Sequence, residues 1–204
     1  MSSERDADKR LKNRRALVER NTKETQITLR LDLDGGVSEI DTGVKFFDHM
    51  LEAFAKHSGS GLVVVARGDG MDHHHLVEDV GIALGRAIYD ALGDKRGIAR
   101  FGSMTVPLDD ALVAGSVDLS GRSYLNFAVR FTAEDIGDLK TELVPEFFRA
   151  LADNGRFNLH LVQMNGHVNH HLCEAAFKAF ARSFAQAKAH TGSAEVLSTK
   201  GILE

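Results

Sequence analysis

The sequence predicts an α+β protein built from two similar halves, each with the element order ββαβα. Apolar residues alternate in short segments, as in strands, and recur at helical spacing in longer ones. The motif His-His-x-x-Glu occurs twice, from His74 to Glu78 and from His170 to Glu174, at an offset of 96 residues. Each copy follows a predicted strand and a glycine-containing loop. These observations indicate an internal duplication of about 90 residues.

The first half is expected to contain a β-hairpin and two helices. Apolar residues alternate along residues 25–33, and a turn at 34–36 leads into a short strand over 37–41. We therefore expect these two strands to pair with each other. The remaining elements of this half are a helix over 46–57, a strand over 61–67 and a helix over 74–92.

The second half repeats this order. Its elements are strands over 111–118 and 124–131, a helix over 141–153, a strand over 157–164 and a helix over 170–190. The repeats therefore cover about 15–95 and 96–190, within a single domain over 15–204 that follows a charged, flexible leader over 1–14. We expect the two sheets to pack together or side by side, with helices covering one face.

Composition limits the possible partners. The chain has 204 residues, of which 43% are hydrophobic and 26% charged, with a net charge of -4, so the basic surface of a nucleic-acid binder is missing. The single Cys173 cannot form an intramolecular disulfide, and no apolar run is long enough to span a membrane. We expect a cytoplasmic protein that binds a small molecule, with no membrane or nucleic-acid partner.

The two His-His-x-x-Glu motifs indicate metal binding. Adjacent histidines diverge by about 100° around a helix, so His74 and His75, like His170 and His171, are suited to two different ions. Imidazole and carboxylate ligands suit manganese, zinc, iron or nickel. An exposed, polar first helical turn is the alternative for one motif, but repetition at the same place in both halves disfavours it. The flanking His73 and His167 are expected in loop or outer-sphere roles.

A second pair of residues matches across the duplication. His49 precedes His74 by 25 residues, and Glu146 precedes His170 by 24, each near the start of the shorter helix of its half. Imidazole and carboxylate both bind transition metals, so the pair could complete two pseudo-symmetric sites. A carboxylate in a first helical turn is also common for dipole reasons alone. Cys173 is expected to be a small buried residue rather than a ligand.

Three segments carry groups that bind anions. They are 96–102 with Arg100, 118–123 with Arg122, and the tail Ser198-Thr199-Lys200-Gly201. Guanidinium forks, hydroxyls and a lysine are the groups that a phosphate needs, although each segment alone could be an exposed loop. The phosphate-binding loop of nucleotide enzymes and the Gly-x-Ser-x-Gly elbow of serine hydrolases are absent from the sequence.

Taken together, the motifs resemble one family, imidazoleglycerol-phosphate dehydratase of histidine biosynthesis. The stretches that carry the resemblance include Arg20-Asn21-Thr22-Lys23-Glu24-Thr25, Phe46-Phe47-Asp48-His49-Met50-Leu51, His74-His75-Leu76-Val77-Glu78-Asp79, Asp118-Leu119-Ser120-Gly121-Arg122, Asn169-His170-His171 and Ser198-Thr199-Lys200-Gly201. The resemblance implies a fold of the ribosomal protein S5 domain 2-like type. It also implies a homo-oligomer of 24 subunits built from trimers, active sites between subunits, and two manganese ions per site.

The resemblance also implies roles for single residues. The metal ligands would be His49, His74, His75, Glu78, His170, His171 and Glu174. Family members often have a histidine ligand where this chain has Glu146, which we include as a ligand because a carboxylate there could still serve. Glu24 would be the acid/base group. Arg100, Arg122, Ser198, Thr199 and Lys200 would bind the substrate phosphate.

The activity implied is dehydration of D-erythro-imidazole glycerol phosphate to imidazole acetol phosphate. The proton to be removed lies on a carbon without an adjacent carbonyl, so we hypothesise that two metal ions hold the substrate ring as an imidazolate. The alternatives are another metal-dependent hydrolase or lyase of a phosphorylated small molecule, and a non-catalytic metal-storage or assembly protein.

Overall fold

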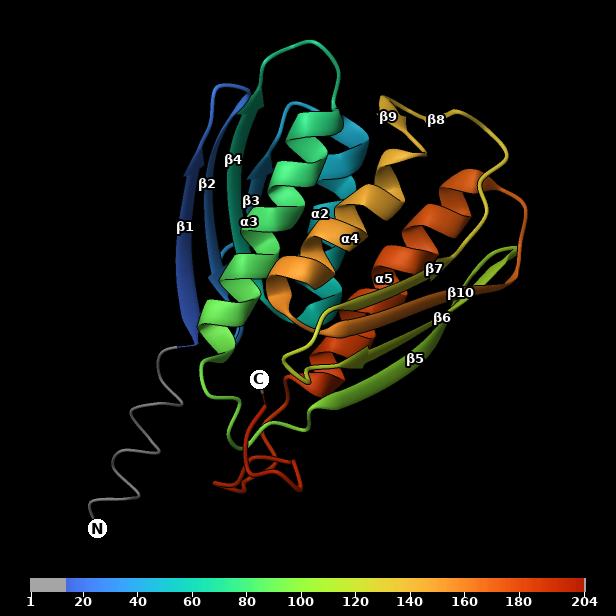
Figure 1. Ribbon diagram of the computed structural model, residues 1–204. Coiled ribbons are helices and arrows are strands. Elements are labelled where there is room, and N and C mark those ends of the chain that lie inside the picture. The colour runs from blue at the N-terminus through green and yellow to red at the C-terminus, as the bar shows by residue number, and fades with distance from the viewer. Residues whose placement is uncertain (1–13, 204) are drawn as a thin grey trace.

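The fold is a three-layer arrangement with two β-sheets on the outside and four helices between them (Figure 1). The computed structural model describes residues 14–203. In the first half lie β1 (Arg15–Asn21), β2 (Thr25–Asp32), β3 (Glu39–Asp41), α2 (Lys45–Ser58), β4 (Gly61–Gly68) and α3 (His74–Leu92). In the second half lie β5 (Phe101–Leu108), β6 (Ala111–Asp118), β7 (Tyr124–Ala128), β8 (Asp135–Ile136), β9 (Leu139–Lys140), α4 (Leu143–Gly155), β10 (Asn158–Asn165) and α5 (Asn169–Ala187).

The α+β class and the internal duplication are both confirmed. The first sheet has the strand order β1-β2-β4-β3 and the second β5-β6-β10-β7, so corresponding strands occupy corresponding places. In each sheet the last strand pair is parallel, β3 with β4 and β7 with β10, and the others are antiparallel. Each half contains an additional strand at its start, β1 or β5, and the second half also contains the short strands β8 and β9. The predicted order ββαβα therefore becomes βββαβα in the first half and βββββαβα in the second.

The predicted β-hairpin is wrong. Residues 25–32 form a strand, but they pair with β1 on one side and β4 on the other, while β3 pairs only with β4. The strand β1 escaped prediction because its alternating positions are only half-buried and include polar residues such as Arg20. The turn at 34–36 instead passes the end of β4 at Gly61, and the backbone φ is positive at Gly35 and Gly36.

The predicted packing of the sheets is also wrong, because the sheets contact neither each other's faces nor each other's edges. Helix α3 packs against α4, and α2 packs against α5, so the helices of the two halves meet in the middle. Helix α5 lies on β5 and β6, and α3 lies on β1 and β2. The prediction that helices cover one face of each sheet is confirmed.

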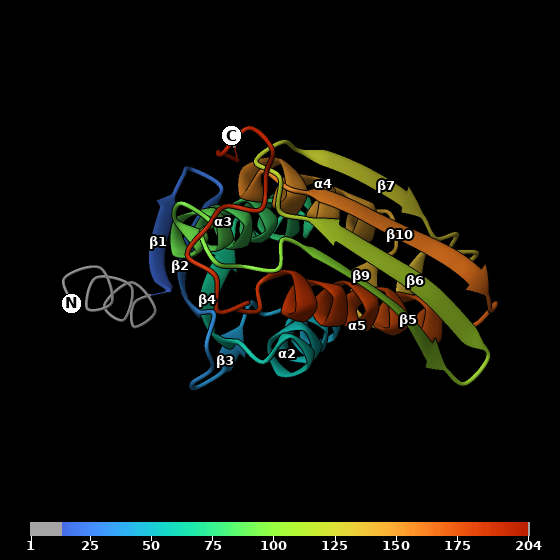
Figure 2. The same ribbon diagram turned by 90° about the horizontal axis from the view of Figure 1, so that it is seen from below.

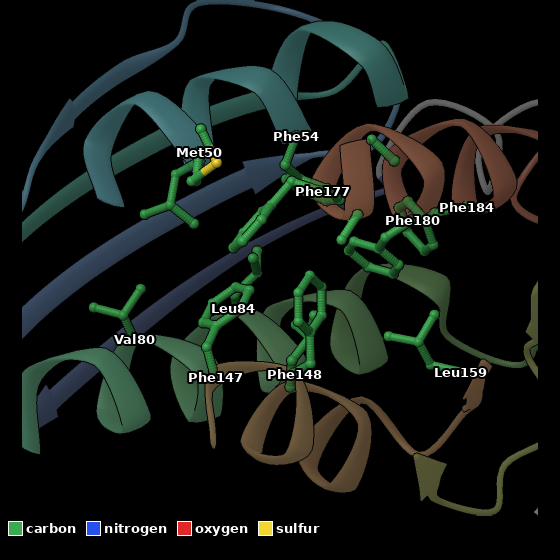
Figure 3. Packing of buried hydrophobic residues seen from close by; sticks show 14 of the residues in the cluster. Met50, Phe54, Val80, Leu84, Phe147, Phe148, Leu159, Phe177, Phe180 and Phe184 are labelled. Carbon is green, nitrogen blue, oxygen red and sulfur yellow. The ribbon is translucent and has the colours of Figure 1, made fainter. Parts of the chain in front are cut away.

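The hydrophobic core lies among the four helices and is rich in phenylalanine (Figure 3). The rings of Phe147 and Phe177 stack with centroids 5.4 Å apart, and Phe54 stacks on Phe180 at 5.2 Å. Buried aromatic rings combine a large apolar area with favourable edge and offset contacts. The core therefore joins α2 and α5 with α4, and it fixes how the two halves face each other.

Two glycines allow α3 and α4 to approach closely. A Cβ atom at Gly81 would lie 2.8 Å from the carbonyl oxygen of Phe147, and one at Gly85 would lie 2.5 Å from that of Leu151. These neighbours are backbone atoms of α4, which cannot move away as a side chain can. A third glycine, Gly59, caps the C-terminus of α2. Its left-handed conformation lets its N–H donate to the carbonyl groups of the last turn.

The ends of the domain differ in part from the prediction. Residues 1–13 of the predicted leader lie outside the described residues. Arg14, which we assigned to the leader, is buried and donates hydrogen bonds to Asp34 and to the carbonyl oxygen of Lys188. The predicted strand over 124–131 ends at Ala128, and the predicted helix over 170–190 ends at Ala187. No helix in residues 14–203 is long and apolar enough to cross a membrane.

Candidate functional site

The starts of the helices gather the residues of both His-His-x-x-Glu motifs at one end of the molecule, the upper end in Figure 1. His74 and His75 open α3, and His170 and His171 lie in the first turn of α5. His49 and Glu146 lie in the first turns of α2 and α4. The element order of the duplication therefore brings all the predicted metal ligands to the same end.

His75 is held by a carboxylate from the loop before its helix. Its Nδ1 lies 3.2 Å from Asp69 Oδ2, and this contact raises the pKa of His75. Its other ring nitrogen, Nε2, lies 3.9 Å from Glu24 Oε2. The structure thus places Glu24, which lies in the turn between β1 and β2, beside the first motif.

A buried network fixes the turn that carries Glu24. Thr22 Oγ1 accepts hydrogen bonds from the backbone N–H groups of Glu24 and Thr25. Thr25 donates its hydroxyl to Asp79 Oδ2 at 2.5 Å, and Arg20 donates to the other oxygen of Asp79 at 2.8 Å. Because Asp79 is buried on α3, one turn after His75, this network ties Glu24 to the helix that carries His75.

His171 has a matching environment in the second half. Its Nδ1 lies 2.7 Å from Asp110 Oδ1, and its Nε2 lies 3.4 Å from Asp109 Oδ2. Asp110 also accepts the backbone N–H groups of His167 and Val168 at the start of α5. These backbone hydrogen bonds, followed by that of His171, lower the pKa of Asp110. In both halves a carboxylate lies closest to Nδ1, and the contact of Nε2 is longer, at 3.9 Å in His75 and 3.4 Å in His171. A carboxylate bound to Nδ1 is typical of metal-binding histidines.

Glu24 and Asp110 occupy equivalent places. Glu24 immediately precedes β2, and Asp110 immediately precedes β6, the corresponding strand of the second sheet. Each contacts the second histidine of the motif in its own half. The family resemblance implies a role for Glu24, whereas Asp110 was not among the predicted site residues. The signal that could have found it is the carboxylate directly before a predicted strand over 111–118.

His49 meets the second motif across the interface of α2 and α5. Glu174 Oε2 lies 3.8 Å from His49 Nε2 and 3.3 Å from His170 Nε2. The ring of Phe46 packs against that of His170, with centroids 5.1 Å apart. Partial burial acts to raise the pKa of Glu174. The nearby charges of Lys178, at 2.7 Å, and of His49 and His170 outweigh this effect, so the pKa is lowered. Three of the predicted metal ligands, His49, His170 and Glu174, therefore lie next to one another.

The corresponding group in the other half is more open. His74 Nε2 lies 3.9 Å from Glu78 Oε2, and Glu146 pairs with Arg149 at 2.8 Å. Within residues 14–203 no three His, Cys, Asp or Glu side chains meet closely enough to hold a metal ion. The donor types fit manganese, and the 3.3 Å separation of His170 and Glu174 matches two ligands of one ion. Each chain therefore presents incomplete sets of suitable ligands.

The predicted phosphate-binding residues lie together at the opposite end. Arg100 donates two hydrogen bonds to Asp118, at 2.7 and 3.1 Å, and a third to the carbonyl oxygen of Leu197 at 2.7 Å. This last bond places the tail that follows, with Ser198, beside Arg100. Lys200 donates its backbone N–H to Ser198 Oγ at 3.2 Å. The side chain of Arg122, four residues after the end of β6, is exposed. Figure 2 shows the tail crossing this end of the molecule.

Within one chain, the residues of the two His-His-x-x-Glu motifs and the predicted phosphate-binding residues lie too far apart to contact one small substrate. Arg100 is bonded through its backbone N–H to Ala187, the last residue of α5, whereas His170 is the second residue of that helix. A helix of 19 residues is about 28 Å long at 1.5 Å per residue. That length greatly exceeds a small phosphorylated substrate.

Comparison with known proteins decides the family. The family model for imidazoleglycerol-phosphate dehydratase matches residues 42–184. The chain belongs to the imidazoleglycerol-phosphate dehydratase family. It is 50% identical over 195 residues to the imidazoleglycerol-phosphate dehydratase of Lachnoclostridium phytofermentans, a match that covers 94% of this chain and 100% of that protein.

Two further relatives extend the comparison. A histidine biosynthesis bifunctional protein from Stenotrophomonas maltophilia is 51% identical over 190 residues, which cover 92% of this chain and 52% of that protein. The crystal structure of the imidazoleglycerol-phosphate dehydratase from Pyrococcus furiosus superimposes with a TM-score of 0.81 at 38% identity, covering 91% of this chain and all of that one. The chain is therefore an enzyme of the dehydratase family, a lyase of histidine biosynthesis, and its fold is that of the family.

The structure shows the surroundings of three further residues that the sequence analysis discusses, Cys173, His73 and His167. Cys173 is fully buried on α5, and burial raises the pKa of its thiol, as expected of a small core residue. His73 is the residue before α3, and His167 lies 3.2 Å from Asp110 in the loop before α5. Asp69 and Asp110, which contact predicted ligands, were missed because their contacts join a loop to a helix. Lys178 was missed although it pairs with Glu174 four residues earlier on the same helix.

Proposed function

We propose that the chain dehydrates D-erythro-imidazole glycerol phosphate to imidazole acetol phosphate, with two manganese ions at each active site. The observation that carries this proposal is the repetition of His-His-x-x-Glu at the same place in two halves of equal topology, in a member of this family. Duplicated imidazole and carboxylate donors suit two ions placed on either side of one small ligand.

We propose further that each active site is shared between chains of a homo-oligomer, with 24 subunits built from trimers. The helix starts with their metal ligands and the end with Arg100, Arg122 and the tail lie at opposite ends of the chain. A second chain can supply the phosphate-binding end beside the helix starts of the first. This arrangement also completes the ligand sets that one chain leaves incomplete.

In this proposal the residues of the chain hold the metal ions, transfer a proton or bind the phosphate. The residues that would hold the metal ions are His49, His74, His75, Glu78, Glu146, His170, His171 and Glu174. The ions would supply Lewis-acid polarisation of the substrate ring. Glu24, fixed by the network through Thr22 and Asp79, moves a proton at the glycerol carbons. Arg100 keeps two of its five N–H donors free of the bonds to Asp118 and Leu197, and these can reach a phosphate.

The phosphate-binding group is completed by Arg122, Ser198, Thr199 and Lys200. Their charges and hydroxyls fix the far end of the substrate, which positions the reacting carbons and slows escape of the intermediate. We place this activity in the cytoplasm, with the small phosphorylated imidazole as partner and with neither nucleic acid nor membrane. The net charge of -4 supports the first of these exclusions.

The test is a product analysis on the purified protein loaded with manganese. Incubation with imidazole glycerol phosphate should yield the ketone, detected as its enolate at high pH, with no release of inorganic phosphate, and the metal content should fall together with the rate on chelation. Release of phosphate would identify a hydrolase instead. Bound metal without turnover of this substrate would identify a storage protein and contradict the proposal.

A further inference from the structure

Lys95 is a buried cation that the proposed reaction does not use. It lies just after α3, at the phosphate-binding end, and only 2% of its surface is exposed. Its Nζ is buried and has no hydrogen-bond partner in the part of the chain that the structure describes. A buried ammonium without a partner is unfavourable for folding, because it has lost its hydration and gained no hydrogen bond. Lys95 therefore does not stabilise the fold through a hydrogen bond of its Nζ.

The surroundings of Lys95 combine one aromatic ring with charges from three other segments. Nζ lies 5.5 Å from the centroid of Tyr89 on α3, and Arg156, after α4, faces the same ring at 5.6 Å. The charges that act on Lys95 are those of Arg156, Asp118 at the end of β6, and Arg100. Two of these three are positive, so the environment does not stabilise the ammonium as an ordinary salt bridge would.

Among these three charged residues only Asp118 is negative, and its carboxylate is bonded to Arg100. Asp118 accepts two hydrogen bonds from Arg100, so this pair by itself has no net charge. A substrate phosphate carries close to two negative charges at neutral pH and needs a positive site. With the charge of Lys95 included, the group of Lys95, Asp118 and Arg100 has a net charge of +1.

We propose that Lys95 is a positioning residue for phosphate binding, whose buried ammonium offsets Asp118 and so leaves the charge of Arg100 available to the substrate. This inference rests on the proposed function, because it assigns the phosphate to Arg100. Lys95 itself does not contact the substrate, since it is buried beneath this end of the molecule.

The protonation of Lys95 gives the inference a pH signature. Burial, followed by the charge of Arg156, lowers the pKa of Lys95 to about 8. The ammonium is therefore present below pH 8 and lost above it, whereas the substrate phosphate is already a dianion and the arginines stay charged. Phosphate affinity should fall as the pH rises through 8.

The experiment compares the wild-type, manganese-loaded assembly with Lys95→Met and with Arg86→Met as a matched control. Arg86 is exposed on α3 and also faces Tyr89, at 6.0 Å, so the control removes one charge near the same ring. For Lys95→Met at pH 7 we expect KM to rise about tenfold with kcat within about twofold, the mark of a change in binding shared by ground and transition states.

The pH profile separates this effect from a structural one. Between pH 7 and pH 9.5 the wild-type and Arg86→Met KM should rise about tenfold, and that of Lys95→Met should stay flat. Binding of inorganic phosphate, measured by calorimetry, should follow the same pattern. Lys95→Met should unfold at the same temperature or higher, because an apolar side chain replaces a buried charge.

The inference is overturned if Lys95→Met keeps the wild-type KM and phosphate affinity, or keeps the wild-type pH profile. Failure of the proposed function gives a different result. In that case the wild-type protein does not form the ketone at all, and the calorimetric comparison with inorganic phosphate still decides whether Lys95 acts on an anion site.

Discussion

Glu24 is the side chain on which the proposed proton transfer depends. It lies 3.9 Å from His75, and its turn is bonded to α3 through Thr25 and Asp79. The variant Glu24→Gln keeps the shape and these backbone contacts but cannot exchange the proton. We expect kcat to fall at least about a hundredfold with unchanged manganese content, measured by ketone formation and elemental analysis. Glu19→Gln, at an exposed position of β1, is the control, and unchanged turnover in Glu24→Gln would remove Glu24 from the mechanism.

Asp110 supports the second motif as Asp69 supports the first. Its carboxylate bonds Nδ1 of His171 and two backbone N–H groups at the start of α5. We expect Asp110→Asn to weaken manganese binding about 10- to 100-fold, because His171 loses the partner that fixes its orientation. A titration against a competing chelator measures this, with Asp153→Asn on the exposed side of α4 as control. Equal affinities in the two variants would show that Asp110 supports only the helix start.

For single residues, the sequence predicts which residues belong to the site better than it predicts their contacts. The repeated spacing of His74, Glu78, His170 and Glu174 was enough to predict matching groups in the two halves, and the structure places both groups at one end of the fold. The contact of Asp110 was not predictable, because it depends on the exact approach of a turn to a helix, whereas the pair of Glu174 and Lys178 follows from their spacing of four residues on one helix. The partner of Glu146 is Arg149 in its own helix, so its assignment as a metal ligand stays a prediction.

The helices carry the site, and their packing depends on close contact between α3 and α4. Ala at Gly85 would gain about 1 kcal/mol of helix propensity, but its Cβ would lie 2.5 Å from the backbone oxygen of Leu151 and 2.8 Å from the backbone nitrogen of Gly155. We expect Gly85→Ala to lower the free energy of unfolding by about 1–2 kcal/mol in total, measured by denaturant unfolding. Gly68→Ala is the control, since its Cβ would meet only Leu76 at 3.4 Å. Equal stability of both variants would show that the helices can separate without cost.

The elements with strong apolar periodicity were predicted most accurately. The helix over 74–92 and the strand over 111–118 have the predicted bounds, because one face of each is continuously buried. The strands β1 and β5 were missed because they lie at sheet edges, where exposed polar residues interrupt the alternation. Missing β1 led directly to the wrong hairpin, since β2 then lacked its true neighbour.

At the scale of the whole molecule, the two groups of predicted site residues lie far apart. The predicted metal ligands lie near the starts of the helices at one end, and the predicted phosphate-binding residues lie at the other, about 28 Å away along α5. The sequence alone could not show this separation, because it depends on helices of 19 residues lying side by side between two sheets. The same separation makes sharing of the active site between chains the central claim.

Complementation between two inactive variants tests this claim most directly. Glu78→Ala damages the metal ligands and Arg122→Ala the phosphate-binding end, and the two chains are co-expressed with different tags in equal amounts. If different chains supply these two residues, about a quarter of the sites combine intact partners, and ketone formation should recover to about a quarter of the wild-type rate. If the co-assembled particles contain both chains and stay as inactive as either variant alone, the residues act within one chain and the account is contradicted.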